Sequence, residues 1–356
     1  MTDIAERQLG DLRWITVRGT PEEAFAALGE HERRDIQDVV RDWGGLKRLR
    51  RQAATPRGAE RLTAVRAASQ RRYPDVWAEL AALAEGAGVP VSDLALQNFR
   101  GDLGIAEPDD GCSDLAWRRE KAYLAHNEDD GPFFAGRSAL VTLALDRLPV
   151  ITAYWKPGFL PSTTFTFTED GLAWGIDHLT VREPAAAEAG RAIVARELQR
   201  TARTVDEATA FLRDHPSAGG YGYLLGSLSG RVVVIDTAAG RYGEREVTPE
   251  DPLFWHTNHG RLISGAEPEP RSTTAERGEV LAALKPPVAE PEPDWFATVL
   301  TGAPPPGGVR ADPGGRTPSI TLCTFVVEFT TGTVEVIPRD ATPVTVPFAD
   351  LVALPL

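Results

Sequence analysis

The chain has 356 residues, of which 42% are hydrophobic and 25% charged, so it can bury a full core in one large domain or two ordinary ones. Its formal net charge of −13 at pH 7 disfavours nucleic acid and anionic membrane surfaces as partners, because both would repel an acidic protein. Two cysteines make no disulfide framework, and no metal-ligand spacing such as Cys-x-x-Cys occurs, so we expect no metal and no other cofactor.

The beginning of the chain carries no secretory pattern. Residues 1 to 6 are acidic and lack the basic start and apolar run of a signal peptide, and no stretch approaches 18 consecutive apolar residues. We therefore expect a cytoplasmic protein with no membrane partner. Its state of association stays open, homo-oligomers included.

Residues 1 to 111 are predicted to be mainly helical, with one early strand at residues 12 to 17, where side chains alternate. Thr20 and Pro21 are typical of a helix start, because proline fits the first helical turn. Apolar side chains then recur at three- and four-residue spacing, which predicts amphipathic helices. These helices are expected over residues 31 to 52, over residues 73 to 86 and from residue 91 onward.

After residue 112 the pattern changes to strands. Strands are predicted at residues 115–118, 122–127, 139–145, 150–155, 163–168, 171–179, 222–227, 231–237, 321–329 and 333–337. Helices are predicted at residues 185–199, 205–214 and 272–284, and the proline- and glycine-rich stretches 286–293 and 302–315 are expected to be surface connectors or a loop over the active site. Strands, then paired helices, then strands indicate an α+β protein with two antiparallel sheets between helix layers.

Cys112 directly follows Gly111 and precedes a predicted strand. Such a junction has one special chemical use. If the thiol attacks the Gly111 carbonyl and the resulting thioester is hydrolysed, Cys112 becomes an N-terminal residue whose thiol is the nucleophile. Its α-amine, with a reference pKa of about 7.7–8.0, is then the base. The alternative is a small buried cysteine beside a turn glycine.

Five separated motifs lie between residues 70 and 340. They are Tyr73-Pro74 with residues 79–86, residues 96–102, Cys112-Ser113 with residues 125–129, residues 256–259, and Val309-Arg310 with residues 321–324. In this order they resemble the acyl-coenzyme A:6-aminopenicillanate acyltransferase family (peptidase family C45), which are N-terminal-nucleophile hydrolases with a Gly-Cys cleavage site. The resemblance implies a four-layer αββα sandwich. Residues 1–111 would be the small chain and residues 112–356 the large chain of one domain.

The resemblance also implies roles for residues around the nucleophile. Asn258 matches the family's oxyanion donor, and an asparagine amide presents two N–H donors without a charge. Asp129 matches the aspartate that orients the new α-amine, and Asn127 is its companion in the Asn-x-Asp motif. Arg310 matches the basic residue before the last strands, with Arg316 as its rival.

Three other positions lie in these motifs, and Asp177 lies between two of them. His256 and His259 are expected to be structural, because the mechanism needs no histidine base. Asp177 stands where relatives often have asparagine. Glu128 occupies the middle of the Asn-x-Asp motif, often an aromatic residue in the family, which affects the shape of the acyl pocket.

The neighbourhood of Cys112 is rich in acids, which raises a hypothesis about the substrate. The acids are Asp102, Asp110, Asp114, Glu128, Asp130 and Asp177. If several of them face the pocket, Coulomb attraction would favour a cationic substrate, whereas the alternative is that they are solvated turn residues.

The resulting prediction is a self-cleaving cysteine hydrolase acting on linear amide bonds through an acyl-Cys112 intermediate. Its partners would be a small-molecule amide or acyl substrate and its own two fragments, which stay associated. Three alternatives stay open: an acyltransferase that delivers the acyl group to an amine, an unprocessed binding protein of the same fold and, third in order, a metal-dependent hydrolase. Cys323, within a continuous apolar strand, is expected to be a core residue.

Overall fold

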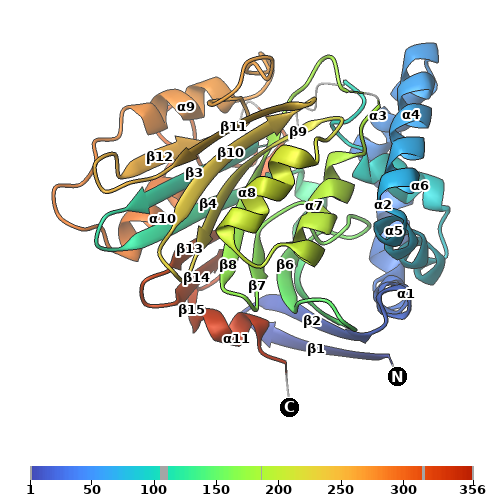
Figure 1. The fold of residues 1–356 in the computed structure, drawn as a ribbon, viewed down its shortest axis with the longest axis horizontal. Helices are drawn as coiled ribbons and strands as arrows, with labels where there is room; N and C mark the ends of the chain where they lie inside the picture. The colour runs from blue at the N-terminus through green and yellow to red at the C-terminus, as the bar shows by residue number, and fades with distance from the viewer. Residues whose placement is uncertain (1, 105–110, 186, 315–316, 355–356) are drawn as a thin grey trace.

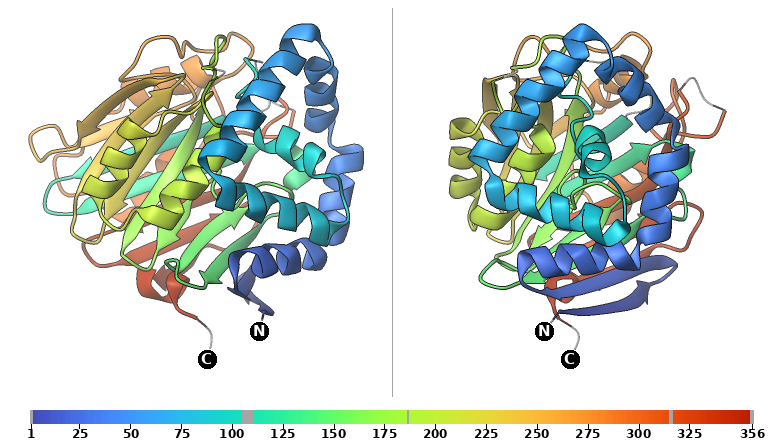
Figure 2. Two further views of the ribbon diagram at one scale, coloured as in Figure 1. Left: turned by 45° about the vertical axis from the view of Figure 1, so that its right-hand side comes forward. Right: turned by 90° about the vertical axis from the view of Figure 1, so that its right-hand side faces the viewer.

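The computed structural model describes residues 2–104, 111–185, 187–314 and 317–354. Two β-sheets lie face to face, and helices cover both outer faces, as Figures 1 and 2 show. The four-layer αββα prediction is confirmed. No helix in the described part of the chain has the length and apolarity to cross a membrane.

The larger sheet has strand order β1-β2-β5-β6-β7-β8-β9-β10-β11. Its strands are β1 (Asp3–Leu9), β2 (Leu12–Gly19), β5 (Ala139–Leu145), β6 (Ile151–Trp155), β7 (Thr166–Thr168), β8 (Leu172–Leu179), β9 (Gly220–Ser227), β10 (Val232–Ala238) and β11 (Arg241–Glu246). β2 pairs with β5 in parallel, so the prediction of two purely antiparallel sheets is wrong at this one junction among the described strands. The reason is that β2 and β5 belong to segments separated by several helices, which leave room for a crossover.

The smaller sheet has strand order β12-β3-β4-β13-β14-β15 and is antiparallel throughout its described pairs. Its strands are β3 (Gly111–Arg118), β4 (Ala122–Asp130), β12 (Leu253–His256), β13 (Ile320–Glu328), β14 (Thr333–Pro338) and β15 (Val344–Pro347). The predicted hairpin after Cys112 is β3 and β4, and these two strands occupy the middle of the sheet with β13.

Helices of the N-terminal segment gather at one end of the molecule (Figure 2). They are α1 (Pro21–His31), α2 (Arg33–Asp42), α3 (Gly44–Ala53), α4 (Pro56–Arg72), α5 (Pro74–Ala87) and α6 (Val91–Asn98). The predicted helix over residues 31 to 52 is divided at Trp43, whose extended backbone ends α2 and precedes α3. Gly88 ends α5 with a φ of 67°, a left-handed conformation that favours glycine.

Four of the remaining α-helices lie on the outer faces of the sheets, and the last one contacts strands of both sheets. They are α7 (Arg191–Thr201), α8 (Val205–Asp214), α9 (Thr274–Ala282), α10 (Pro293–Thr301) and α11 (Phe348–Val352), with a short 3-10 helix at Pro132–Phe134. α8 packs on β9, β10 and β11 of the larger sheet, whereas α9 packs on β12 and α10 on β4 and β13 of the smaller one. The proline-rich stretch therefore leads into a helix that covers the sheet carrying Cys112.

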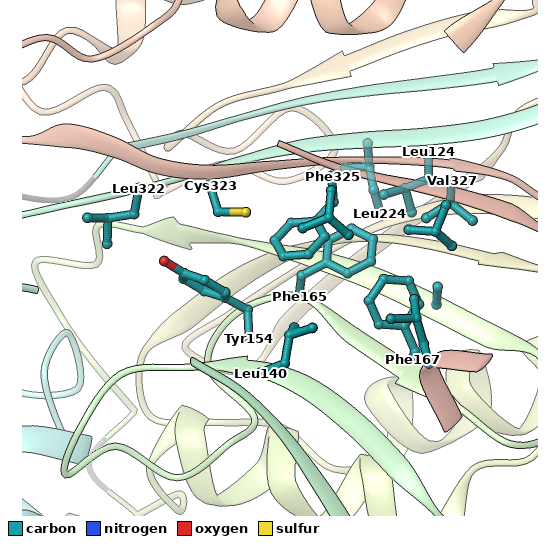
Figure 3. Close-up of a cluster of buried hydrophobic side chains, with 14 of the residues drawn as sticks. Leu124, Leu140, Tyr154, Phe165, Phe167, Leu224, Leu322, Cys323, Phe325 and Val327 are labelled. Carbon is teal, nitrogen blue, oxygen red and sulfur yellow. The ribbon is translucent and has the colours of Figure 1, made fainter. Parts of the chain in front are cut away.

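The space between the sheets is filled by large apolar side chains (Figure 3). Phe165, before β7, stacks on Phe325 of β13 with ring centroids 4.9 Å apart. Tyr154 of β6 also meets the Phe325 ring, edge to face. Cys323 is fully buried in this cluster, which confirms the expectation that it is a core residue.

Candidate active site

Cys112 is the second residue of β3 and its side chain points between the two sheets. Side chains alternate along a strand, and Asp114, two residues on, meets His126 and Asp177 on this inner face. Leu115 instead packs on the outer face with α9 and α10. Cys112 is only 6% exposed and lines a pocket with residues of both sheets. Burial, followed by the charge of Glu128, raises the pKa of its thiol well above the usual value.

Asn258 lies two residues after β12 and contacts the backbone of Cys112. Its side-chain Oδ1 accepts a hydrogen bond from the Cys112 N–H at 2.9 Å. Its Nδ2 is buried and has no hydrogen-bond partner among the described residues. A buried donor without a partner is costly, so this N–H group is available to an acceptor that enters the site.

Arg277 of α9 joins the same group of atoms, and sequence reasoning missed it. Its guanidinium donates to Asn258 Oδ1 at 2.5 Å, to Ser113 Oγ at 2.8 Å and to the Cys112 carbonyl. The side chain is 1% exposed. The sequence offers no signal for this role, because Arg277 is an ordinary arginine in an amphipathic helix until α9 packs on β12.

Arg310, predicted for this position, lies elsewhere. Its guanidinium donates to the Thr301 carbonyl at 3.0 Å and to Asp312 at 2.8 Å. The arginine that contacts Cys112 is therefore Arg277, and the cause of the misplacement is an uncertain loop length before β13. Arg316, the rival candidate, is outside the described residues.

Asp129 of β4 is opposite Gly111 in the register of the hairpin. Its Oδ1 accepts a hydrogen bond from Thr321 at 2.6 Å, while its Oδ2 is buried without a partner among the described residues. A Cβ atom on Gly111 would lie 3.1 Å from that free oxygen, so the carboxylate is beside the Gly111–Cys112 junction. Burial raises the pKa of Asp129 to about 7, although Arg277 acts in the opposite direction.

The other predicted residues form the framework of the site. Asn127 donates from Nδ2 to the Leu300 carbonyl of α10 at 2.8 Å and accepts from Thr324 at 2.5 Å, which ties β4 to its neighbours. His259 contacts the hydroxyls of Thr257 and Thr274, both at 3.0 Å. Burial lowers the pKa of His259 to about 4, so it is neutral near pH 7.

A continuous series of buried ionisable side chains connects the two sheets next to Cys112. Its members, in order of contact, are Lys156, Glu128, His126, Asp114, Asp177, His256 and Asp236. We call this set the inter-sheet ionic chain.

Most contacts along the inter-sheet ionic chain join a cation to a carboxylate, except that the carboxyl groups of Asp114 and Asp177 meet each other. Burial acts against protonation of His256, but Asp177 and Asp236 raise its pKa to about 10. Burial and the neighbouring Asp177 raise the pKa of Asp114 well above its usual value, and each of these two carboxylates has one oxygen without another partner. A proton held by Asp114 and donated to Asp177 accounts for both orphaned oxygens.

Acids near the pocket are paired with buried cations. Lys156 donates to Glu128 at 2.7 Å and to Asp130 at 2.5 Å, and Arg100 donates to Asp130 at 3.1 Å. Asp177 is likewise paired with His256. The hypothesis that an acidic pocket favours a cationic substrate is therefore wrong in its premise, since these carboxylates are neutralised within the protein. Asp110 is outside the described residues.

Comparisons with known proteins identify a family. A family model described as acyl-coenzyme A:6-aminopenicillanic acid acyl-transferase matches residues 117–337, a range that begins after Cys112 and contains Asp129, Asn258 and Arg277. No curated protein matches the chain.

Solved structures give distant matches. Penicillin V acylase from Agrobacterium tumefaciens is 14% identical, with a TM-score of 0.40, over 66% of this chain and 84% of that one. A variant of conjugated bile acid hydrolase from Clostridium perfringens is 8% identical, with a TM-score of 0.43, over 68% and 95%. The family model spans more than half of the sequence, and the chain therefore belongs to the acyl-coenzyme A:6-aminopenicillanic acid acyl-transferase family.

Proposed function

We propose that this protein is a self-cleaving cysteine N-terminal-nucleophile hydrolase acting on amide bonds of small molecules. The observation that carries the proposal is the meeting of three groups at the Gly111–Cys112 junction. Asn258 Oδ1 accepts the Cys112 N–H, Asn258 Nδ2 is an unused donor, and Asp129 Oδ2 is an unused acceptor. A structural cysteine has no need of such an arrangement.

Self-cleavage would proceed in two steps. The Cys112 sulfur attacks the Gly111 carbonyl carbon, a C–S bond forms, and the Gly111–Cys112 C–N bond breaks as the nitrogen takes a proton. Water then hydrolyses the thioester, which leaves the Gly111 carboxylate and a free thiol on Cys112. The new α-ammonium lies beside Asp129 Oδ2 and Asn258 Oδ1, both of which accept hydrogen bonds from it.

Turnover uses the same atoms on an external amide. The α-amine of Cys112 takes the thiol proton, the thiolate attacks the substrate carbonyl, and Asn258 Nδ2 donates to the developing oxyanion. The amine product leaves with the proton, and water releases the acid from acyl-Cys112. Arg277 holds Asn258 Oδ1 and so fixes the orientation of the amide.

The second candidate is acyl transfer, which the description of the matching family favours. The two reactions share the acyl-Cys112 intermediate and differ only in whether water or an amine resolves it. Adding a primary amine to the assay distinguishes them, because a transferase forms a new amide whereas a hydrolase releases free acid at an unchanged rate.

Intact mass under denaturing conditions tests the proposal. Wild type is expected to give two fragments of 111 and 245 residues. Cys112→Ala should give one chain of 356 residues, and the matched control Cys323→Ala, which alters the other buried cysteine, should give two fragments again. A single full-length chain for wild type would instead favour the binding-protein alternative. Amide hydrolysis by wild type should be abolished by a thiol reagent and in Cys112→Ala.

A further inference from the structure

Cys112, His126 and Glu128 bring three metal-binding atoms together on the inner face of β3 and β4. One sulfur, one imidazole nitrogen and one carboxylate oxygen lie within 4.8 Å of one another, and all three residues are buried. Cys112 and Glu128 are directly opposite in the hairpin register, which puts their side chains on the same face. The mechanism above uses only the sulfur of this group.

The separations suit a tetrahedral ion. His126 Nε2 and Glu128 Oε2 are 3.2 Å apart. Two ligands at about 2.0–2.2 Å from a tetrahedral zinc ion lie about 3.4 Å from each other, so this pair needs almost no movement. A sulfur ligand at about 2.3 Å would lie about 3.6 Å from the nitrogen, so the thiol needs to shift by about an ångström or less.

Neighbouring groups already orient two of the three ligands. Asp114 contacts Nδ1 of His126 at 2.7 Å, which leaves Nε2 facing the cysteine and the glutamate. This carboxylate–histidine arrangement is the usual outer support of a zinc-binding histidine. Lys156 holds Oε1 of Glu128 at 2.7 Å, and so directs Oε2 toward His126.

We propose that Cys112, His126 and Glu128 form a binding site for zinc and other thiophilic divalent ions, and that an ion bound there blocks the nucleophile. The thiol proton leaves to the buffer as the metal–sulfur bond forms. His126 binds through Nε2 once that nitrogen carries no proton, and Glu128 binds as the carboxylate. Three protein ligands leave a fourth position on the pocket side for water. The ion is an inhibitor here, because it occupies the electron pair with which sulfur attacks a carbonyl.

Cobalt binding tests the site without any activity measurement. Co²⁺ added to the chelator-treated wild-type protein should give the near-ultraviolet thiolate-to-cobalt absorption band, and Zn²⁺ should remove it. The band should be absent in Cys112→Ala and retained in Cys323→Ala, since Cys323 lies in an apolar cluster. Zinc affinity should fall about tenfold or more in Glu128→Gln, and about 10–100-fold in Asp114→Asn, which keeps all three ligands and changes the contacts of Asp114 to His126 and Asp177.

A second group of potential ligands provides the remaining control. Glu6, His31 and Glu32 are also close together, at a more exposed position and without sulfur. His31→Gln should therefore leave the cobalt–thiolate band unchanged. A band that persists in Cys112→Ala, or that never forms in wild type, would overturn the proposal. Because binding needs no self-cleavage, these outcomes are separate from the mass measurement, and in a cleaved active enzyme zinc should abolish turnover and a chelator should restore it.

Discussion

Asn258 uses its two amide atoms for different partners, and one substitution separates them. In Asn258→Asp the retained Oδ1 still accepts from the Cys112 N–H, whereas the free Nδ2 donor becomes an oxygen. Loss of one oxyanion donor costs about 10²–10³ in turnover, so kcat should fall by that factor. Steady-state hydrolysis of an amide substrate measures this change in kcat. Substrate binding by Asn258→Asp is the control that shows the variant is folded. A kcat within threefold of wild type would remove Asn258 from the oxyanion role.

Arg277 and Arg310 form a natural pair for comparison. Arg277→Met removes the guanidinium from Asn258 and Cys112, and hydrogen bonds to a charged donor contribute about 1.5–3 kcal/mol each, so processing and turnover should slow by at least tenfold. Arg310→Met, which removes contacts to Thr301 and Asp312, should leave both rates within about twofold. Processing is followed by mass and folding by thermal unfolding. If processing and turnover slowed in Arg310→Met and not in Arg277→Met, Arg310 would be the arginine that supports the site.

Asp102 makes stability depend on pH. It is fully buried and accepts the backbone N–H groups of Arg191 at 3.0 Å and Gly219 at 2.7 Å. Burial raises its pKa from 3.8 to about 7, against the opposing effect of Arg191. The folded protein therefore holds a proton that the unfolded chain has lost, and stability falls as pH rises from about 3.8 to about 7.

Asp102→Asn isolates this contribution, because the amide mimics the protonated acid and keeps the accepting oxygen. A shift of about three pKa units corresponds to roughly 4 kcal/mol. The variant should therefore gain unfolding free energy relative to wild type as pH rises across that window, measured by urea denaturation. The exposed Asp146→Asn is the control and should follow wild type. A parallel pH dependence in wild type and Asp102→Asn would show that Asp102 is ionised throughout.

Site residues could be predicted from the sequence where the proposed chemistry requires one residue type. Cys112 after glycine, Asn258 and Asp129 each carry atoms that the proposed reaction would use, and the fold brings all three to one junction. Arg277 was not accessible, because only the packing of α9 on β12 gives that arginine its partners. The motif predicts only that Glu128 affects the shape of the acyl pocket, whereas its pairing with Lys156 depends on a contact between separate sheets.

At the scale of the elements, His256 connects β12 of one sheet to β8 and β10 of the other. Its two nitrogens contact Asp177 at 2.6 Å and Asp236 at 2.8 Å, and all three side chains are fully buried. His256→Leu would leave two buried carboxylates without their cation, so the free energy of unfolding should fall by about 3–5 kcal/mol. His259→Leu, at a neutral histidine bonded to two threonines, should cost about 1 kcal/mol. Equal losses in urea denaturation would contradict the charged role of His256.

The elements themselves were largely predictable, since alternation and helical spacing are local. β5 and α8 have the bounds that their patterns predict, whereas α7 begins at Arg191, six residues later than predicted. Residues 185–190 include four alanines and one glutamate, which favour a helix, yet the Ala189–Ser217 bridge competes with the helix there. α10 was missed because a proline-rich stretch precedes it, although Pro293 is at a position that helices accept.

At the scale of the whole molecule, the segment before Cys112 is part of the shared core. β2 pairs with β5 through six residue pairs, Trp14 donates to Thr142 at 2.8 Å, and Glu79 is bonded to Arg196 at 2.7 Å. The two fragments of the proposed cleavage should therefore co-elute as one species in size-exclusion chromatography and separate only under denaturing conditions. Elution of a free 245-residue piece under native conditions would show that the interface does not outlast cleavage.

The inter-sheet ionic chain has a consequence for how this protein can evolve. Each member is buried and contacts the next, so a single replacement leaves a neighbouring ionisable group without its partner at a position with little exposure to solvent. Substitutions at Glu128, His126, Asp114, Asp177, His256 and Asp236 are therefore non-additive. In natural variants of this protein, residues at these positions should therefore change together, whereas the apolar residues around them should change independently of one another.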